Sequence, residues 1–136
     1  DTLHPVLQYF KDHHGQELEV AIGGLMARQS DSLHSIVADF VNSLPDLGLA
    51  AMDSAAATCK SVMIAMALHD RAIDADAAVA AARYEEGWQE GIWGTVEGGH
   101  DLDTADIRVR LTAADTIFRM ISLAPSDFTR TEKDPQ

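Results

Sequence analysis

The feature that most constrains the fold is a long apolar run near the middle of the chain. From Leu47 to Leu68 only Asp53 and Lys60 carry a charge, and the apolar residues lie all round a helical axis. A helix that is hydrophobic on every side is buried, either inside a bundle or in a membrane. The two charges and the many Ala, Ser and Thr residues make membrane insertion unfavourable. We therefore predict one helix over residues 46–69 at the centre of a bundle, with no membrane insertion.

Two stretches before this run have the periodicity of amphipathic helices. Residues 3–14 and 31–44 carry apolar side chains at offsets of three, four and seven, which place them on one helical face. In the second stretch this face forms the stripe that we expect to be buried. The expected boundaries of these helices are Gly15, Ser30 or Asp31, and Pro45.

Two further helices are predicted after the apolar run. One covers residues 74–93, with Asp74 as its N-cap and several alanines that allow close helix packing. The other begins at Asp101 or Asp103 and ends before Pro125. Residues 17–22 alternate between apolar and polar, which fits a short strand or an extended connector. Together these patterns predict an all-α bundle of about five helices.

The two charged residues inside the apolar run have no fixed environment in this prediction. Asp53 and Lys60 lie seven residues apart and so share one face of the predicted helix. They form a buried pair, contact another domain, or are both exposed, and the sequence does not choose among these arrangements.

Length and charge limit the classes of function. A chain of 136 residues fits one domain, here residues 1–136. The formal charge of −12 excludes nucleic acid and an anionic membrane as natural partners, because both require a basic face. The single cysteine, Cys59, favours a reducing compartment and reads as an unreactive core thiol. Because the first residue is not Met, we expect a domain cut from a longer chain.

The most unusual segment runs from Arg83 to Arg110. It holds both tryptophans, and seven acidic residues stand between Arg83 and Arg108 without a Lys or Arg among them. Four interpretations remain open. The segment forms a metal site from Glu97, His100 and nearby Glu residues, an acid–base site with Glu85 and Glu97, a structural loop, or a protein-binding surface. No nucleophile elbow, phosphate-binding glycine loop or zinc-protease motif accompanies it.

Eleven residues of this segment form the pattern R-x-E-E-x-W-Q-x-x-x-W-G-x-V-E-x-x-H-D. They are Arg83, Glu85, Glu86, Trp88, Gln89, Trp93, Gly94, Val96, Glu97, His100 and Asp101. The pattern resembles the signature of the assembly chaperone that binds the alpha subunit of the F-type ATP synthase catalytic head. The resemblance extends from Leu33 to Leu123. The many fixed positions at fixed spacing make this signature specific.

The resemblance implies a fold and a function. Members of this family have a β-containing N-terminal domain and a helical C-terminal domain, and the chain resembles the second alone. The implied function is to hold an unassembled alpha subunit and prevent its aggregation, without enzymatic activity, cofactor or metal. The alternative is a small carboxylate-based enzyme or a metal-binding helical protein that uses residues 85–106.

The resemblance also implies where the protein works and which residues bind its partner. We expect a monomer in the bacterial cytoplasm, or in the mitochondrial matrix if the source is eukaryotic. The expected partner-binding residues are Glu85, Glu86, Trp93, Glu97, His100 and Asp101.

Overall fold

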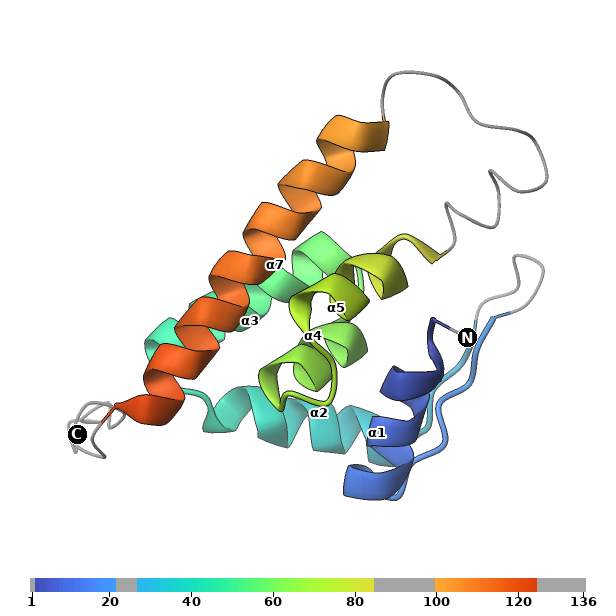
Figure 1. Cartoon of the computed structure of the whole chain (residues 1–136). Coiled ribbons are helices and arrows are strands. Elements are labelled where there is room, and N and C mark those ends of the chain that lie inside the picture. The colour runs from blue at the N-terminus through green and yellow to red at the C-terminus, as the bar shows by residue number, and fades with distance from the viewer. Residues whose placement is uncertain (1, 22–26, 85–99, 125–136) are drawn as a thin grey trace.

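Every regular element in the described part of the chain is a helix. The computed structural model describes residues 2–21, 27–84 and 100–124, with only the backbone at positions 100 and 101. These ranges contain α1 (His4–His14), α2 (Asp31–Ser43), α3 (Asp46–Cys59), α4 (Val62–His69), α5 (Ala75–Ala82) and α7 (His100–Leu123). The all-α prediction is confirmed within them (Figure 1).

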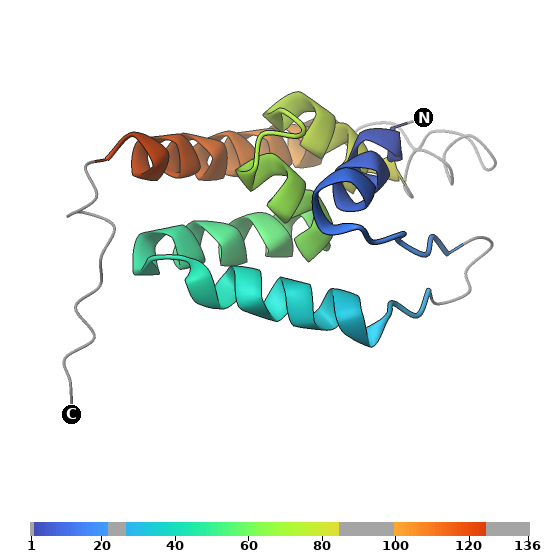
Figure 2. The same cartoon turned by 90° about the horizontal axis from the view of Figure 1, so that it is seen from below.

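The helices pack as a bundle in which α3, α4 and α7 make the most extensive contacts. α2 and α3 are joined through Pro45, and α3 then runs antiparallel beside α7 (Figure 2). α4 contacts α3, α5, α7 and α1, so it lies between the long helices and the N-terminal one. None of the helices in the described ranges has both the length and the hydrophobicity that a membrane span requires.

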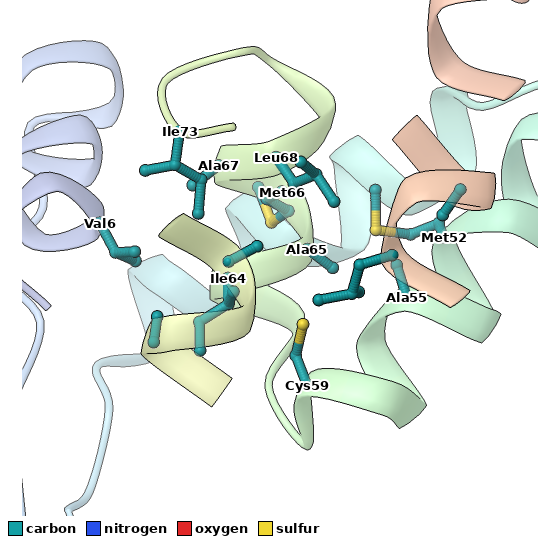
Figure 3. Close-up of a cluster of buried hydrophobic side chains, with 14 of the residues drawn as sticks. Val6, Met52, Ala55, Cys59, Ile64, Ala65, Met66, Ala67, Leu68 and Ile73 are labelled. Carbon is teal, nitrogen blue, oxygen red and sulfur yellow. The ribbon is translucent and has the colours of Figure 1, made fainter. Parts of the chain in front are cut away.

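The core is centred on α4, the most apolar part of the central run. Five consecutive residues, from Ile64 to Leu68, are buried. Figure 3 shows them beside Met52 and Ala55 of α3, with Cys59 at the base of the cluster. The buried face of α7 supplies Leu111, Ala114 and Phe118. The prediction of a central buried helix is therefore confirmed for α4, whereas α3 exposes part of its surface.

The prediction of one continuous helix over residues 46–69 is wrong. α3 ends at Cys59, Lys60 adopts a left-handed conformation with φ of 53°, and α4 begins after Ser61. The amide of Ser61 donates to the carbonyl of Ala56 at 3.1 Å, which closes the end of α3. The Ser61 hydroxyl then accepts from the amide of Ile64 and caps α4. The break turns α4 away from the axis of α3, so that it packs against α5 and α1.

Several predicted boundaries agree with the structure. α1 ends at Gly15, whose φ of 61° is the left-handed conformation that glycine adopts without strain. Ser30 rather than Asp31 caps α2, because its hydroxyl accepts from the amide of Leu33 at 3.1 Å. The Asp74 carboxylate caps α5 by accepting from the amide of Ala77 at 2.8 Å.

Other boundaries need correction. α5 ends at Ala82, with Arg83 as its C-cap, so the helix predicted over residues 74–93 is interrupted there, and residues 85–93 lie outside the described ranges. α7 begins at His100, so Asp101 and Asp103 lie inside its first turn instead of capping it. Carboxylates in a first turn interact favourably with the positive end of the helix dipole.

Two further expectations also change. Of the stripe predicted to be buried in α2, only Leu33 is buried, because α2 lies at the margin of the bundle and its other apolar residues are half-covered. Residues 17–21 are an extended connector without strand pairing in the described ranges. The Gln29 amide bridges this connector to the chain before α2 by donating to the carbonyl of Glu19 at 2.8 Å.

Candidate functional site

The residues predicted to bind a partner lie mostly outside the part of the chain that the structure describes. Glu85, Glu86, Trp93 and Glu97 all fall in the range 85–99. His100 and Asp101 form the first turn of α7, and only their backbone is described. The positions of these six residues relative to one another therefore remain a prediction.

The helices on either side of this segment are joined to each other. The Arg83 guanidinium, at the end of α5, donates to the hydroxyl of Thr104 in α7. Near the start of α5, Asp76 forms an ion pair with Arg108, which lies one turn further along α7 than Thr104. The two ends of the signature segment are thus held at one end of the bundle, where α5 finishes and α7 starts (Figure 1).

An open groove adjoins the beginning of α7. It has a volume of about 380 Å³ and lies between the C-terminal half of α3 and the N-terminal half of α7. Its charged lining residues are Lys60, Asp103, Asp106 and Arg110. Arg110 donates to Asp106 at 2.8 Å, one turn away on the same helix. The groove therefore presents both signs of charge to solvent beside the signature segment.

The two charges of the central apolar run are exposed residues. Asp53 and Lys60 are both exposed, and no ion pair among the described residues joins them. The break after Cys59 removes Lys60 from the helical register that the prediction assumed. Lys60 faces the groove beside α7 instead.

The described residues give no support to a reactive thiol. Cys59 is buried, and burial raises the pKa of its thiol to about 12. The thiolate is the nucleophilic form, so this thiol is unreactive at neutral pH, as the sequence predicted. Within the described ranges, no three His, Cys, Asp or Glu side chains come close enough to hold a metal ion. Glu97 lies outside these ranges, so the metal interpretation of the acidic segment is not tested.

A second polar cluster was not predicted from the sequence. It joins α1 to the end of α4. The Tyr9 hydroxyl donates to Oδ2 of Asp70 at 2.5 Å. Because that hydroxyl has one proton, its contact of 3.0 Å with Nε2 of His14 requires the histidine to donate. The other carboxylate oxygen of Asp70 accepts from Nδ1 of His69 at 2.7 Å.

The electrostatics of this cluster favour an ionised Asp70 beside a neutral Tyr9. The hydrogen bond from His69 holds the pKa of Asp70 below its usual value, the bond from Tyr9 adds to this effect, and burial opposes it. Burial, followed by the neighbouring Asp70, raises the pKa of Tyr9. The His69 ring also packs edge-on against Phe40 and Phe118. The cluster is arranged to fix α1 in place against the end of α4.

Comparisons with known proteins place this fold. No family model matches the chain. Its sequence is 25% identical over 120 residues to the protein named atp12, mitochondrial, of Schizosaccharomyces pombe. This alignment covers 86% of the chain and 41% of the Schizosaccharomyces pombe protein. The structure superposes on Atp12 from Paracoccus denitrificans with a TM-score of 0.76, at 20% identity, over 88% of the chain and 51% of that protein. The chain is homologous to Atp12.

The structural similarity to Atp12 extends to two other solved structures. The D202K mutant of the Paracoccus denitrificans Atp12 also superposes with a TM-score of 0.76. Atu1473 of Agrobacterium tumefaciens, a proposed chaperone, superposes with a TM-score of 0.67 at 24% identity, over 85% of the chain and 43% of that protein. The chain thus spans about half the length of its Atp12 relatives, or somewhat less. The part of this chain that the structure describes within the match is the helical bundle given above.

Proposed function

We propose that this chain is the helical domain of a chaperone for ATP synthase assembly, and that it binds the unassembled alpha subunit of the catalytic head. The observation that carries the proposal is the match to Atp12 in both sequence and fold. The resemblance of the segment from Arg83 to Asp101 to the chaperone signature supports it independently of the fold. A working place in the bacterial cytoplasm or in the mitochondrial matrix is compatible with the bacterial and mitochondrial relatives.

Physical chemistry is consistent with this role. An unassembled subunit exposes apolar surface that its neighbours cover in the assembled complex, and such surface aggregates until it is covered. A chaperone with a charge of −12 stays soluble and attracts basic regions of its client over long distances. The role requires neither a catalytic group nor a cofactor, and we propose that the chain acts without either and as a monomer.

The proposed contact region is the signature segment. Glu85, Glu86, Glu97 and Asp101 would supply polar contacts, with His100 beside them, and Trp93 would anchor the edge of the patch. α5 and α7 pack directly against each other, and the exposed ion pair between Arg108 and Asp76 also joins them, so that both ends of the segment are attached to the bundle.

Capture of purified subunits tests the proposal. The immobilised chain is mixed with alpha or beta subunits, and light scattering follows the aggregation of alpha with and without the chain. We expect retention of alpha, little retention of beta, and less scattering. If the properly folded chain retains neither subunit and leaves scattering unchanged, the proposed function is wrong. Elemental analysis for bound metal then tests the alternative, a metal-binding or carboxylate-based site in residues 85–106.

A charge reversal tests the contact region. Glu97→Lys should weaken alpha binding at least tenfold, because it places a cation where the client supplies one. Asp39→Lys, an exposed acid on α2, is the matched control and should leave binding unchanged. Circular dichroism should show intact helices in both variants. An unfolded Glu97→Lys variant would instead assign Glu97 a structural role.

A further inference from the structure

The groove between α3 and α7 is lined by a lysine that has no partner within the described part of the chain. Lys60 is exposed and makes no ion pair or side-chain hydrogen bond with the described residues. The other Lys and Arg residues of these ranges, apart from Arg28, each have a carboxylate or hydroxyl partner. Because acidic residues outnumber Lys and Arg by 22 to 10, a lysine that pairs with none of them is unexpected. Its ammonium group is available to a carboxylate of another molecule.

The backbone of Lys60 gives a second, independent observation. Its φ of 53° lies in the left-handed region, which glycine enters without steric cost and lysine does not. Unfavourable backbone conformations of this kind concentrate at functional sites. A glycine at the end of α3 would relieve the strain but would carry no side chain into the groove. The turn is therefore less stable than it could be, and it places a cation on the groove wall.

The other charges of the groove limit what can bind beside Lys60. Asp103 of α7 is exposed and has no ion pair or side-chain hydrogen bond among the described residues. Asp106 and Arg110 neutralise each other across one helical turn. The groove therefore presents one unpaired cation from α3 and one unpaired anion from α7. An occupant with a carboxylate for Lys60 and a cation for Asp103 complements this pattern, whereas a uniformly basic occupant is repelled by Lys60.

The shape and lining of the groove favour a segment of a protein over a small molecule. Sites for small molecules are mostly apolar and enclose most of the ligand, whereas this groove is open and most of its lining residues are charged or carry a hydroxyl. Its volume of about 380 Å³ accommodates a few side chains. It also adjoins the first turns of α7, which carry His100 and Asp101 of the proposed contact region.

We infer that Lys60 is a specificity-determining residue, which binds a carboxylate on a client segment that also presents a cation to Asp103. This inference rests on the proposed chaperone function and adds a contact to it. Uniform negative charge attracts any basic surface, including those of unrelated proteins. A cation and an unpaired carboxylate on facing helices fix the register of the client, and the cation disfavours surfaces that carry positive charge alone.

The test separates a specific contact of Lys60 from general electrostatic attraction. Lys60→Glu and the matched control Lys11→Glu make the chain more negative by the same amount. Lys11 is an exposed lysine of α1 that does not line the groove. Binding of purified alpha subunit is measured by biolayer interferometry, and urea unfolding checks the stability of each variant. If net charge alone attracts a basic client, neither variant binds more weakly than the unmodified chain. If Lys60 contacts a carboxylate, only Lys60→Glu does.

We expect Lys60→Glu to bind alpha at least about tenfold more weakly, because repulsion replaces an attraction at the same position. The double variant Lys60→Glu, Asp103→Lys keeps the net charge of the chain and should also bind at least about tenfold more weakly, since it reverses both contacts. Lys60→Gly should raise the urea midpoint and yet weaken binding about threefold. Opposite changes in stability and affinity would show that the loss of binding does not come from unfolding.

Three outcomes would overturn the role of Lys60 and leave the chaperone function standing. The first is binding by Lys60→Glu that is as tight as binding by Lys11→Glu. The second is unchanged binding by the double variant, and the third is unchanged binding by Lys60→Gly. Failure of the unmodified, folded chain to bind alpha would overturn both the role of Lys60 and the proposed function.

Discussion

At the residue scale, one hydrogen bond has a definable effect on stability. Tyr9→Phe removes the hydroxyl that donates a hydrogen bond to Oδ2 of Asp70 at 2.5 Å, and it leaves the surrounding packing intact. The loss should lower the free energy of unfolding by about 1–2 kcal/mol at pH 7, as for a part-buried hydrogen bond to a charged group. Urea unfolding measures it. Gln8→Ala is the control, because its bond to Asp12 is exposed and should contribute less than about 0.5 kcal/mol.

The same cluster predicts how stability depends on pH. The pKa of Asp70 is lowered in the folded chain, chiefly by His69 and then by Tyr9 against the effect of burial. The ionised carboxylate therefore stabilises the fold above pH about 4, and this contribution is lost as the pH falls through the folded pKa. Tyr9→Phe should lose less stability than the unmodified chain between pH 5 and pH 3 (about the range of titration). Identical losses in both proteins would show that Tyr9 does not help to hold Asp70 ionised.

The turn between α3 and α4 contains a residue in an unfavourable conformation. Lys60 has a φ of 53°, a region that glycine enters without the steric cost of a side chain. Lys60→Gly should raise the free energy of unfolding by about 0.5–1 kcal/mol in thermal or urea unfolding. Arg71 has a similar φ of 61°, but its guanidinium donates to Ser122 at 2.7 Å. Arg71→Gly should therefore raise the free energy of unfolding by less than Lys60→Gly does. A larger increase for Arg71→Gly would mean that the hydrogen bond between Arg71 and Ser122 contributes nothing to stability.

At the element scale, the close packing of α3 depends on small side chains. Ala55 of α3 is fully buried, and it faces the core around α4. Ala55→Leu should cost about 1–3 kcal/mol, because the added atoms must displace packed neighbours. Ala50→Leu places the same side chain at an exposed position of the same helix and should change stability by less than about 0.5 kcal/mol. A tolerated Ala55→Leu, seen as an unchanged urea midpoint, would mean that space remains at this contact.

Helix boundaries were predictable where a residue has a local chemical reason to end or begin a helix. Gly15 takes the left-handed conformation because it lacks a Cβ, and the side chains of Ser30 and Asp74 accept backbone hydrogen bonds, so each residue type is itself the signal. Lys60 has no such signal, since lysine is a good helix former and adopts its turn only because the packed bundle imposes it. The contact between Tyr9 and Asp70 joins residues 61 positions apart and depends on the folded arrangement of α1 and α4.

In the candidate site, too, the features with a local sequence signal were predictable, and those that depend on the folded arrangement were not. The signature from Arg83 to Asp101 was recognisable because its residues are close together in sequence. The apolar residues of α7 are also visible in the sequence, but an exposed and a buried apolar position look alike until packing assigns one of them to the core. In α7 the buried face is the one with Leu111 and Phe118, and only the packing of the described helices shows that Leu102, Val109 and Met120 are exposed instead.

At the scale of the whole molecule, net charge should control how fast the client is captured. The chain carries −12 with an isoelectric point near 4.6, so its field attracts basic surfaces before any contact forms. Salt shortens the reach of this field from about 10 Å at 0.1 M to about 3 Å at 1 M. We expect the association rate with alpha to fall about tenfold between 0.05 M and 0.5 M NaCl, measured by stopped-flow fluorescence.

The dissociation rate should respond less to salt, because the apolar contact proposed for Trp93 is short-ranged and is not screened. The variant Trp93→Gln provides the matched comparison. It keeps the net charge of the chain, so its association rate should show the same salt dependence, while its complex dissociates faster. An association rate that is independent of salt, with dissociation that accelerates instead, would mean that the acidic charge acts only through local contacts in the formed complex. Long-range attraction would then have no part in the capture of the client.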